Sequence, residues 1–144
     1  MAIQTVTVVR PHPAIVGLMV PFLEQLGIGV EQLTQLADLP LKVTAETEAV
    51  IISLSVTSPV QISVERVLQM VLYLNPNVRL IFSSELPLQK KQKNLRYLLS
   101  RYGRNSSILS VGGTEQSNSC LYIWANDLQD TERRQQLKQL LQCW

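Results

Sequence analysis

Short apolar runs rich in β-branched residues alternate along this chain with longer segments of helical periodicity. The predicted strands are residues 4–9, 48–57, 78–83, 108–111 and 120–125. The run EAVIISLSVT at 48–57 carries no charge after its first residue, which is typical of a strand buried on both faces of a parallel sheet. Alternation at this spacing predicts βαβ units and therefore an α/β fold, a doubly wound parallel sheet with helices on both faces.

Four helices are predicted between or after these strands. They are residues 14–26, 58–74 and 88–102, and a last helix capped by Asn126 or Asp127. The second helix has a start signal, with Ser58 at the N-cap and Pro59 at the first helical position. Pro21 lies inside the first helix, and we expect it to kink that helix without breaking it, because the residue under its ring is Gly17.

The segment 28–48 is open to two interpretations. Residues 28–33 fit a strand, whereas residues 31–38 fit a short helix. Pro40 would end either element, and the pattern alone does not choose between them.

Size and composition narrow the class of protein. A chain of 144 residues fits one domain spanning residues 1–144. Its 46% hydrophobic and 17% charged residues exclude intrinsic disorder. Cys120 and Cys143 match no metal-ligand spacing and are too few for a disulfide scaffold. No apolar run approaches the roughly 18 residues of a membrane span, and we expect a cytoplasmic protein.

Positive charge is concentrated in one segment. Residues 86–114 hold six basic side chains and no acidic one, while the rest of the chain holds seven basic and eleven acidic side chains. The predicted helix at 88–102 therefore has a basic face, which suits either simple solvation or docking to an acidic protein surface. The candidate interface residues on that face are Lys90, Lys93, Arg96 and Arg101. Nucleic-acid binding is disfavoured, since Tyr97 is the only aromatic residue there that could stack on a base.

The carboxyl ends of the strands are where doubly wound sheets bind ligands. These ends lie at residues 10–13, 53–59, 83–87 and 110–114. They contain no catalytic set: the only histidine is His12, and the only carboxylates nearby are Glu85 and Glu115. Such a set is too poor in oxygen ligands for Mg²⁺ and lacks a nucleophile elbow. We therefore expect neither an enzyme nor a bound metal or cofactor.

Three segments are similar to bacterial response-regulator receiver domains. The sequence VVRPHPAIVGLMVPFLEQLG at 8–27 resembles the start of such a domain. Ser55 and Pro59 keep the spacing of the phosphorylated aspartate and the proline four residues after it. Ser83 or Ser84 stands where receivers place a hydroxyl that bonds the phosphoryl group. The resemblance implies a flavodoxin-like strand order of 2-1-3-4-5, to which this chain adds an extra strand near 120–125.

The departures from that family remove its chemistry. The acidic pair that holds Mg²⁺ is replaced by Arg10 and Pro11, and Ser55 replaces the nucleophile. The lysine at the end of the fifth strand has no match in residues 110–113. The resemblance therefore implies a pseudo-receiver, a signalling or adaptor domain that is not phosphorylated and acts by protein–protein interaction or dimerisation. The degenerate phosphorylation pocket remains a candidate binding site, comprising Arg10, His12, Ser55, Ser83 and Ser84.

A second function class stays open. An α/β domain of this kind could bind a small ligand or cofactor in the crevice at the strand ends. Residues 53–55 resemble the Ser-x-Leu pattern of cobalamin-binding domains, and His12 fits their histidine. However, Arg10 and Ile15 stand where that family has aspartate and glycine, so the resemblance to receivers is the stronger one.

Overall fold

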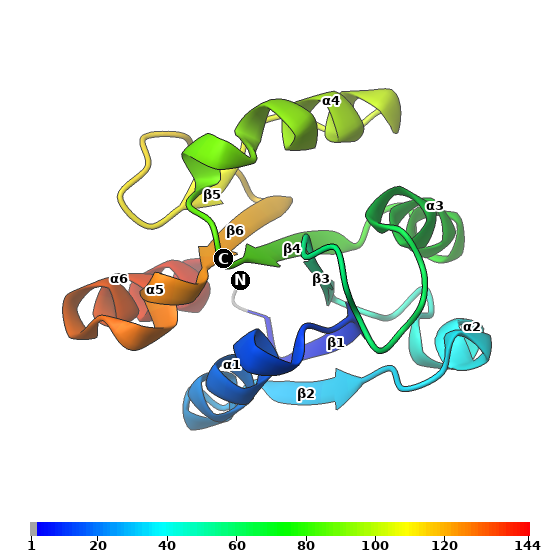
Figure 1. Ribbon diagram of the computed structural model, residues 1–144, viewed down its shortest axis with the longest axis horizontal. Coiled ribbons are helices and arrows are strands. Elements are labelled where there is room, and N and C mark those ends of the chain that lie inside the picture. Colours follow the sequence, from blue (N-terminus) through cyan, green and yellow to red (C-terminus); the bar gives the residue numbers. More distant parts are fainter. Residues whose placement is uncertain (1–2) are drawn as a thin grey trace.

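The computed structural model describes residues 3–144. These residues form a six-stranded sheet in the order β2-β1-β3-β4-β6-β5 (Figure 1). Every pair of neighbouring strands is parallel. The strands are β1 (Thr5–Arg10), β2 (Gly29–Gln32), β3 (Ala49–Ser53), β4 (Arg79–Ser84), β5 (Leu109–Ser110) and β6 (Cys120–Trp124). The predicted α/β fold with a doubly wound parallel sheet is confirmed.

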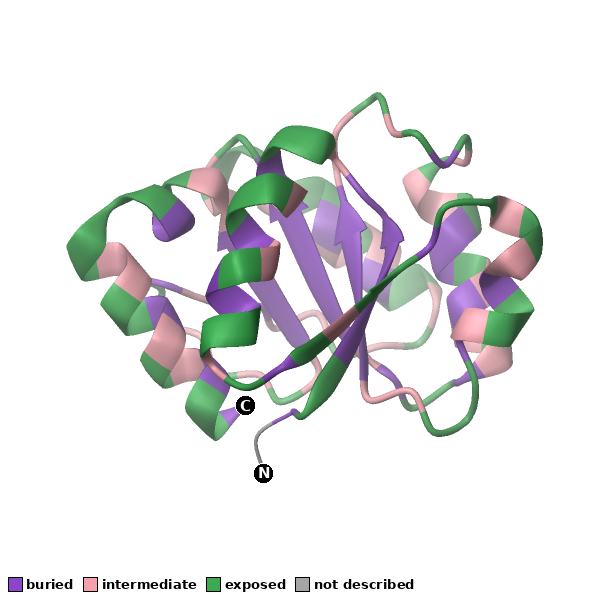
Figure 2. Cartoon of the chain, turned by 90° about the horizontal axis from the view of Figure 1, so that it is seen from below, coloured by how far each residue is buried: buried purple, intermediate pink, exposed green. Residues whose placement is uncertain are grey.

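Helices cover both faces of the sheet. They are α1 (Pro13–Gln25), α2 (Leu39–Lys42), α3 (Val64–Leu74), α4 (Gln92–Arg101), α5 (Ala125–Gln129) and α6 (Thr131–Cys143), with single 3₁₀ turns at Leu36–Asp38 and Leu88–Lys90. One core forms under α1, α5 and α6, and the other under α2, α3 and α4. Successive residues of β3 alternate between the two cores: Ile51 joins the first, whereas Val50 and Ile52 join the second. The central strands are therefore buried on both sides (Figure 2).

Helix α1 and the segment 28–48 agree only in part with what the sequence predicts. Helix α1 runs unbroken through Pro21, which lies on its exposed side. In the open segment 28–48 the strand alternative is confirmed as β2, whereas the helix comes later than residues 31–38, as a 3₁₀ turn at Leu36–Asp38 followed by α2. The prediction that Pro40 ends an element is wrong, because Pro40 lies in the first turn of α2, where its missing N–H needs no partner.

The predicted start of the second helix is wrong. Helix α3 begins at Val64, with Ser63 Oγ accepting a hydrogen bond from Arg66 N at 3.1 Å. Ser58 instead donates its hydroxyl to the carbonyl of Pro11 at 2.7 Å. Residues 54–63 form a loop, and the side chain of Arg10 from β1 binds three of its backbone carbonyls.

The extra strand lies elsewhere than predicted. We expected residues 108–111 in the fifth place and residues 120–125 as the addition. In the structure β6 pairs with β4 over five residues, and β5 is a two-residue strand at the edge. The longer apolar run CLYIW fills the buried place better, since four of its five residues are buried. The last helix also differs: α6 is capped by Asp130, whose Oδ2 accepts from Arg133 N, and Asp127 lies in α5.

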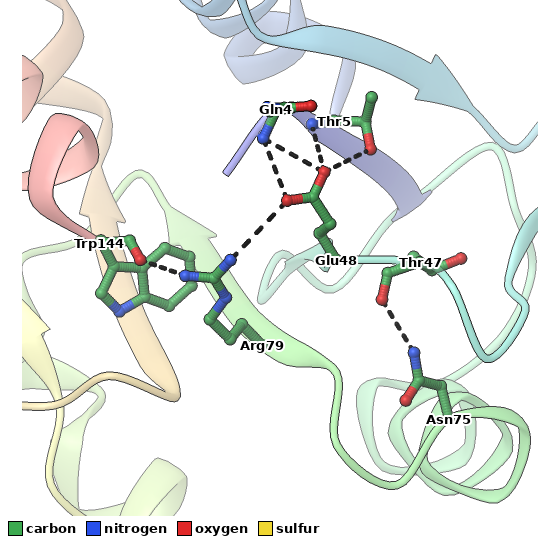
Figure 3. A network of polar contacts seen from close by, with 7 residues as sticks. All are labelled: Gln4, Thr5, Thr47, Glu48, Asn75, Arg79 and Trp144. Atoms are coloured by element: carbon green, nitrogen blue, oxygen red, sulfur yellow. Dashed lines mark hydrogen bonds and ion pairs between the residues drawn. The ribbon is translucent and has the colours of Figure 1, made fainter. Parts of the chain in front are cut away.

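The amino ends of the strands are tied together by a polar network (Figure 3). Glu48 accepts hydrogen bonds from the backbone N–H groups of Gln4 and Thr5. Arg79 lies 3.9 Å from the Glu48 carboxylate, donates to the carbonyl of Trp144 and stacks on its ring at 5.2 Å. These contacts join the amino ends of β1, β3 and β4 to the last residue, and the candidate site lies at the opposite end, where the strands have their carboxyl ends. Within residues 3–144 no helix is long and apolar enough to cross a membrane.

Candidate functional site

The topological switch point of the sheet lies between β1 and β3. The chain leaves β1 for α1 on one face, and leaves β3 for the long loop 54–63 and α3 on the other face (Figure 1). Such a switch point opens a crevice between the two connections at the carboxyl edge. Arg10 is the last residue of β1 and lies at this point, opposite Ile52 of β3.

The guanidinium of Arg10 fills the crevice. The residue is only 4% exposed. Its Nη1 donates to the carbonyls of Ser53 at 2.7 Å and Ser55 at 2.6 Å, and its Nε donates to that of Ile62 at 2.8 Å. A longer bond of 3.3 Å joins Nη2 to the carbonyl of Val56. Burial lowers the pKa of Arg10, and among residues 3–144 no carboxylate forms an ion pair with it.

Arg10 therefore acts as an internal brace of the loop 54–63. Its donors bind the carbonyl of Ile62, just before α3, and three carbonyls where the chain leaves β3. They leave little capacity for an outside anion, since Nε and both hydrogens of Nη1 are already engaged.

The predicted serines gather at the same edge with Arg10. Ser53 and Ser83 are register partners on β3 and β4, and Ser83 accepts a hydrogen bond from Leu54 N at 2.8 Å through its carbonyl. Ser55 is half-buried just beyond β3, and its N–H donates to Ser53 Oγ at 3.2 Å. Ser84 uses its hydroxyl to accept from Leu86 N at 3.0 Å, which forms the turn after β4.

His12 joins two loops across the mouth of the crevice. It is the N-cap residue of α1, and its Nε2 lies 3.3 Å from Glu85 Oε1 in the loop after β4. Its Nδ1 is buried and has no hydrogen-bond partner among residues 3–144. The structure thus brings together the five residues predicted for the degenerate pocket, but as parts of a packed edge.

Two aromatic residues of β6 complete this edge, and sequence reasoning missed them. Tyr122 donates its hydroxyl to the carbonyl of Leu86 at 2.5 Å, and Trp124 Nε1 donates to that of Glu85 at 3.0 Å. Burial raises the pKa of Tyr122. Together they hold the loop after β4 against the sheet. The length of the run CLYIW was the signal that could have placed these residues beside β4.

A second cleft opens at the ends of β5 and β6, with a volume of about 380 Å³. Its wall contains Asp127, which is 1% exposed and accepts from Arg133 Nε at 2.8 Å. The Arg133 guanidinium also stacks on Trp124 at 5.2 Å and donates to the carbonyl of Val111. Burial raises the pKa of Asp127, against the opposing effect of its hydrogen bonds. The polar groups of this cleft mainly satisfy one another.

The basic side chains of the predicted helix 88–102 fall into two groups, those that form ion pairs with described residues and those that do not. Arg96 binds both oxygens of Glu115, with Nη2 and Oε2 2.5 Å apart, and this hydrogen bonding lowers the pKa of Glu115. Arg101 pairs with Glu65 of α3 at 2.7 Å. Lys90 and Lys93 are exposed, and no described residue forms an ion pair with either. Two of the four predicted interface residues therefore hold the fold together.

The arrangement offers no nucleophilic carboxylate and a cation where a metal would have to bind. Across residues 3–144 no three His, Cys, Asp or Glu side chains gather closely enough to hold a metal ion. The strand in the fifth place ends at Trp124 and is followed by Ala125, so a lysine is missing at that strand end too.

The chain matches no protein-family model and no curated protein sequence significantly. Its shape resembles solved receiver domains. A CheY-like receiver domain protein from Methanospirillum hungatei is 14% identical, with a TM-score of 0.54 over 98% of this chain and 99% of that one. A response regulator from Burkholderia pseudomallei, solved with a phosphorylated aspartic acid, calcium ion and citrate, is 14% identical, with a TM-score of 0.54 over 96% of this chain and 74% of that one.

A receiver domain from Rhodospirillum rubrum is 13% identical, with a TM-score of 0.52 over 92% of this chain and 91% of that one. At these identities the likeness establishes the fold. The receiver fold that the sequence resemblance implied is therefore confirmed.

Proposed function

We propose that residues 1–144 form one receiver-like signalling module of the cytoplasm that is not phosphorylated and that works by binding a protein partner or a second copy of itself. The observation that carries the proposal is the bonding of Arg10 to four backbone carbonyls in the crevice. A fixed guanidinium takes the place that a metal ion and its carboxylates need for phosphoryl transfer. It also repels a divalent cation, and Ser55 supplies no carboxylate to accept the phosphoryl group.

The same edge favours a module held in one state. Switching in a two-state protein needs an element with two arrangements whose balance a ligand can shift. Here Arg10 braces the loop 54–63, while Tyr122 and Trp124 hold the loop after β4. These bonds also favour docking over a small ligand in the crevice, since the donors of Arg10 there already bind backbone carbonyls.

Phosphoryl transfer from acetyl phosphate in the presence of Mg²⁺ tests the proposal. The intact mass of the wild-type chain and of Ser55→Asp should show no added phosphoryl group, because the Mg²⁺ carboxylates are missing in both and Arg10 remains in the crevice. An active receiver domain treated in parallel is the positive control. A phosphorylated Ser55→Asp chain would overturn our account of Arg10, and a phosphorylated wild-type chain would overturn the proposed function.

A further inference from the structure

A groove with an apolar floor runs between α3 and α4. It has a volume of about 340 Å³. Its apolar lining consists of Leu54, Val64, Leu95, Leu98 and the ring of Tyr97, and its polar lining of Glu65, Lys91 and Asn94. Leu95 is buried, whereas Tyr97 is 68% exposed. This α3–α4 groove is thus a hollow beside an aromatic ring that solvent reaches.

Arg10 keeps this groove formed from a distance. The loop 54–63 begins at Leu54 and ends immediately before Val64, so both of its ends lie in the groove wall. The carbonyls that Arg10 binds belong to this loop. The groove is present in the structure without a partner, and a preformed groove lowers the entropic cost of binding.

The charges around the groove are unequal. Arg101 reaches across to Glu65 of α3, so one end of the groove is neutralised. Lys93 lies one helical turn before Tyr97, and Tyr97 one turn before Arg101, so the three share a face of α4. Lys91 lines the other end of the groove, and neither it nor Lys93 forms an ion pair with any described residue. That end is therefore an uncompensated positive rim beside an apolar hollow.

We infer that the α3–α4 groove binds an acidic segment of a partner protein, one that buries a bulky apolar side chain against Tyr97 and Leu98 and sets its carboxylates beside Lys91 and Lys93. The inference rests on the proposed function and names the partner's chemistry. An aromatic anchor in a hollow with charges at its rim is the usual arrangement of a strong contact. A basic segment would be repelled by the lysines, and a purely polar one would leave the hollow unfilled.

Selection from a display library of random peptides on the full chain tests the inference, followed by fluorescence anisotropy of the enriched peptide. We expect enriched peptides to carry a bulky apolar residue flanked by Asp or Glu. Tyr97→Ala, and Lys91→Glu combined with Lys93→Glu, should each weaken binding by about tenfold or more, and added salt should weaken it as well. Tyr73→Ala and Lys138→Glu are matched controls, because Tyr73 is 87% exposed and both residues lie outside the groove.

Several results would overturn the inference. They are a selection that enriches nothing, one that enriches neutral or basic peptides, and unchanged binding by the groove variants while circular dichroism shows them folded. Sedimentation velocity gives a further test, since a dimer that Tyr97→Ala dissociates would assign the groove to a second copy. Association through any other surface would sink this inference and leave the proposed function standing, whereas a phosphorylated wild-type chain would sink the proposed function.

Discussion

Arg10 is the residue whose surroundings are hardest to explain by packing alone. A guanidinium that is almost fully buried without a carboxylate loses its hydration and must recover it from other dipoles. Four carbonyls supply those dipoles, and three of them belong to the loop 54–63. The loop and the arginine therefore depend on each other.

Replacing Arg10 with an apolar side chain of similar length should expose that dependence. In Arg10→Met the carbonyls of Ser53, Ser55 and Ile62 lose their donors, so we expect the free energy of unfolding to fall by about 2–4 kcal/mol. Urea denaturation at neutral pH measures the change. Arg66→Met is the matched control, since Arg66 is exposed on α3. The free energy of unfolding of this variant should stay within about 0.5 kcal/mol of wild type. An Arg10→Met protein as stable as wild type would contradict the brace.

The two cysteines make a second residue-scale prediction. Cys120 is buried in β6, and burial raises its pKa to about 12, so at pH 8 it stays in the unreactive thiol form. Cys143 is exposed at the end of α6. An Ellman titration at pH 8 should find one fast-reacting thiol per folded chain and two in denaturant. Cys143→Ser should remove the fast phase, and two fast thiols in the folded protein would refute the burial of Cys120.

At the scale of elements, sequence reasoning succeeded where one apolar pattern dominates. Strands β1, β3 and β4 and helices α1 and α4 follow from their β-branched runs and helical spacing. The start of α3 did not follow from the sequence. The cap signal at Ser58 and Pro59 is local, whereas the bonds that hold the loop 54–63 come from Arg10, more than 40 positions away. The places of β5 and β6 in the sheet were predicted wrongly for the same reason, because pattern alone does not say which of two short apolar runs lies beside β4.

The candidate site shows the same division. Arg10, His12, Ser55, Ser83 and Ser84 were predicted at one edge, and they do lie there. Their bonds were not predictable, since Arg10 was considered as part of a candidate binding site and instead binds backbone carbonyls. The missed contributions of Tyr122 and Trp124 followed directly from the misplaced strand.

The loop after β4 makes an element-scale prediction. Tyr122→Phe removes the hydrogen bond to the carbonyl of Leu86 while keeping the ring in the core. We expect faster amide hydrogen exchange in residues 84–87 and a loss of about 1 kcal/mol of stability. Mass-resolved exchange of the native protein measures this. Tyr73→Phe on exposed α3 is the control and should leave the loop unchanged, and equal exchange in wild type and Tyr122→Phe would show that the bond does not hold the loop.

At the scale of the whole molecule, the amino ends and the carboxyl ends of the strands are held by different interactions. The amino edge is joined by Glu48, Arg79 and Trp144, which connect β1, β4 and the end of the chain (Figure 3). The carboxyl edge is held by Arg10 and the aromatic donors of β6, in the place where a receiver would carry its phosphorylation chemistry. Our proposals therefore place protein binding on the outside of the helices, in the groove between α3 and α4.

Native mass spectrometry of the protein purified from its own host tests the central claim most directly, because it reads association and bound small molecules in one spectrum. Our account predicts a dimer, or a mass that matches this chain plus another protein, with no stoichiometric small adduct. A monomer that carries one small molecule per chain would contradict it and would move the function into the crevice around Arg10, His12 and Ser55.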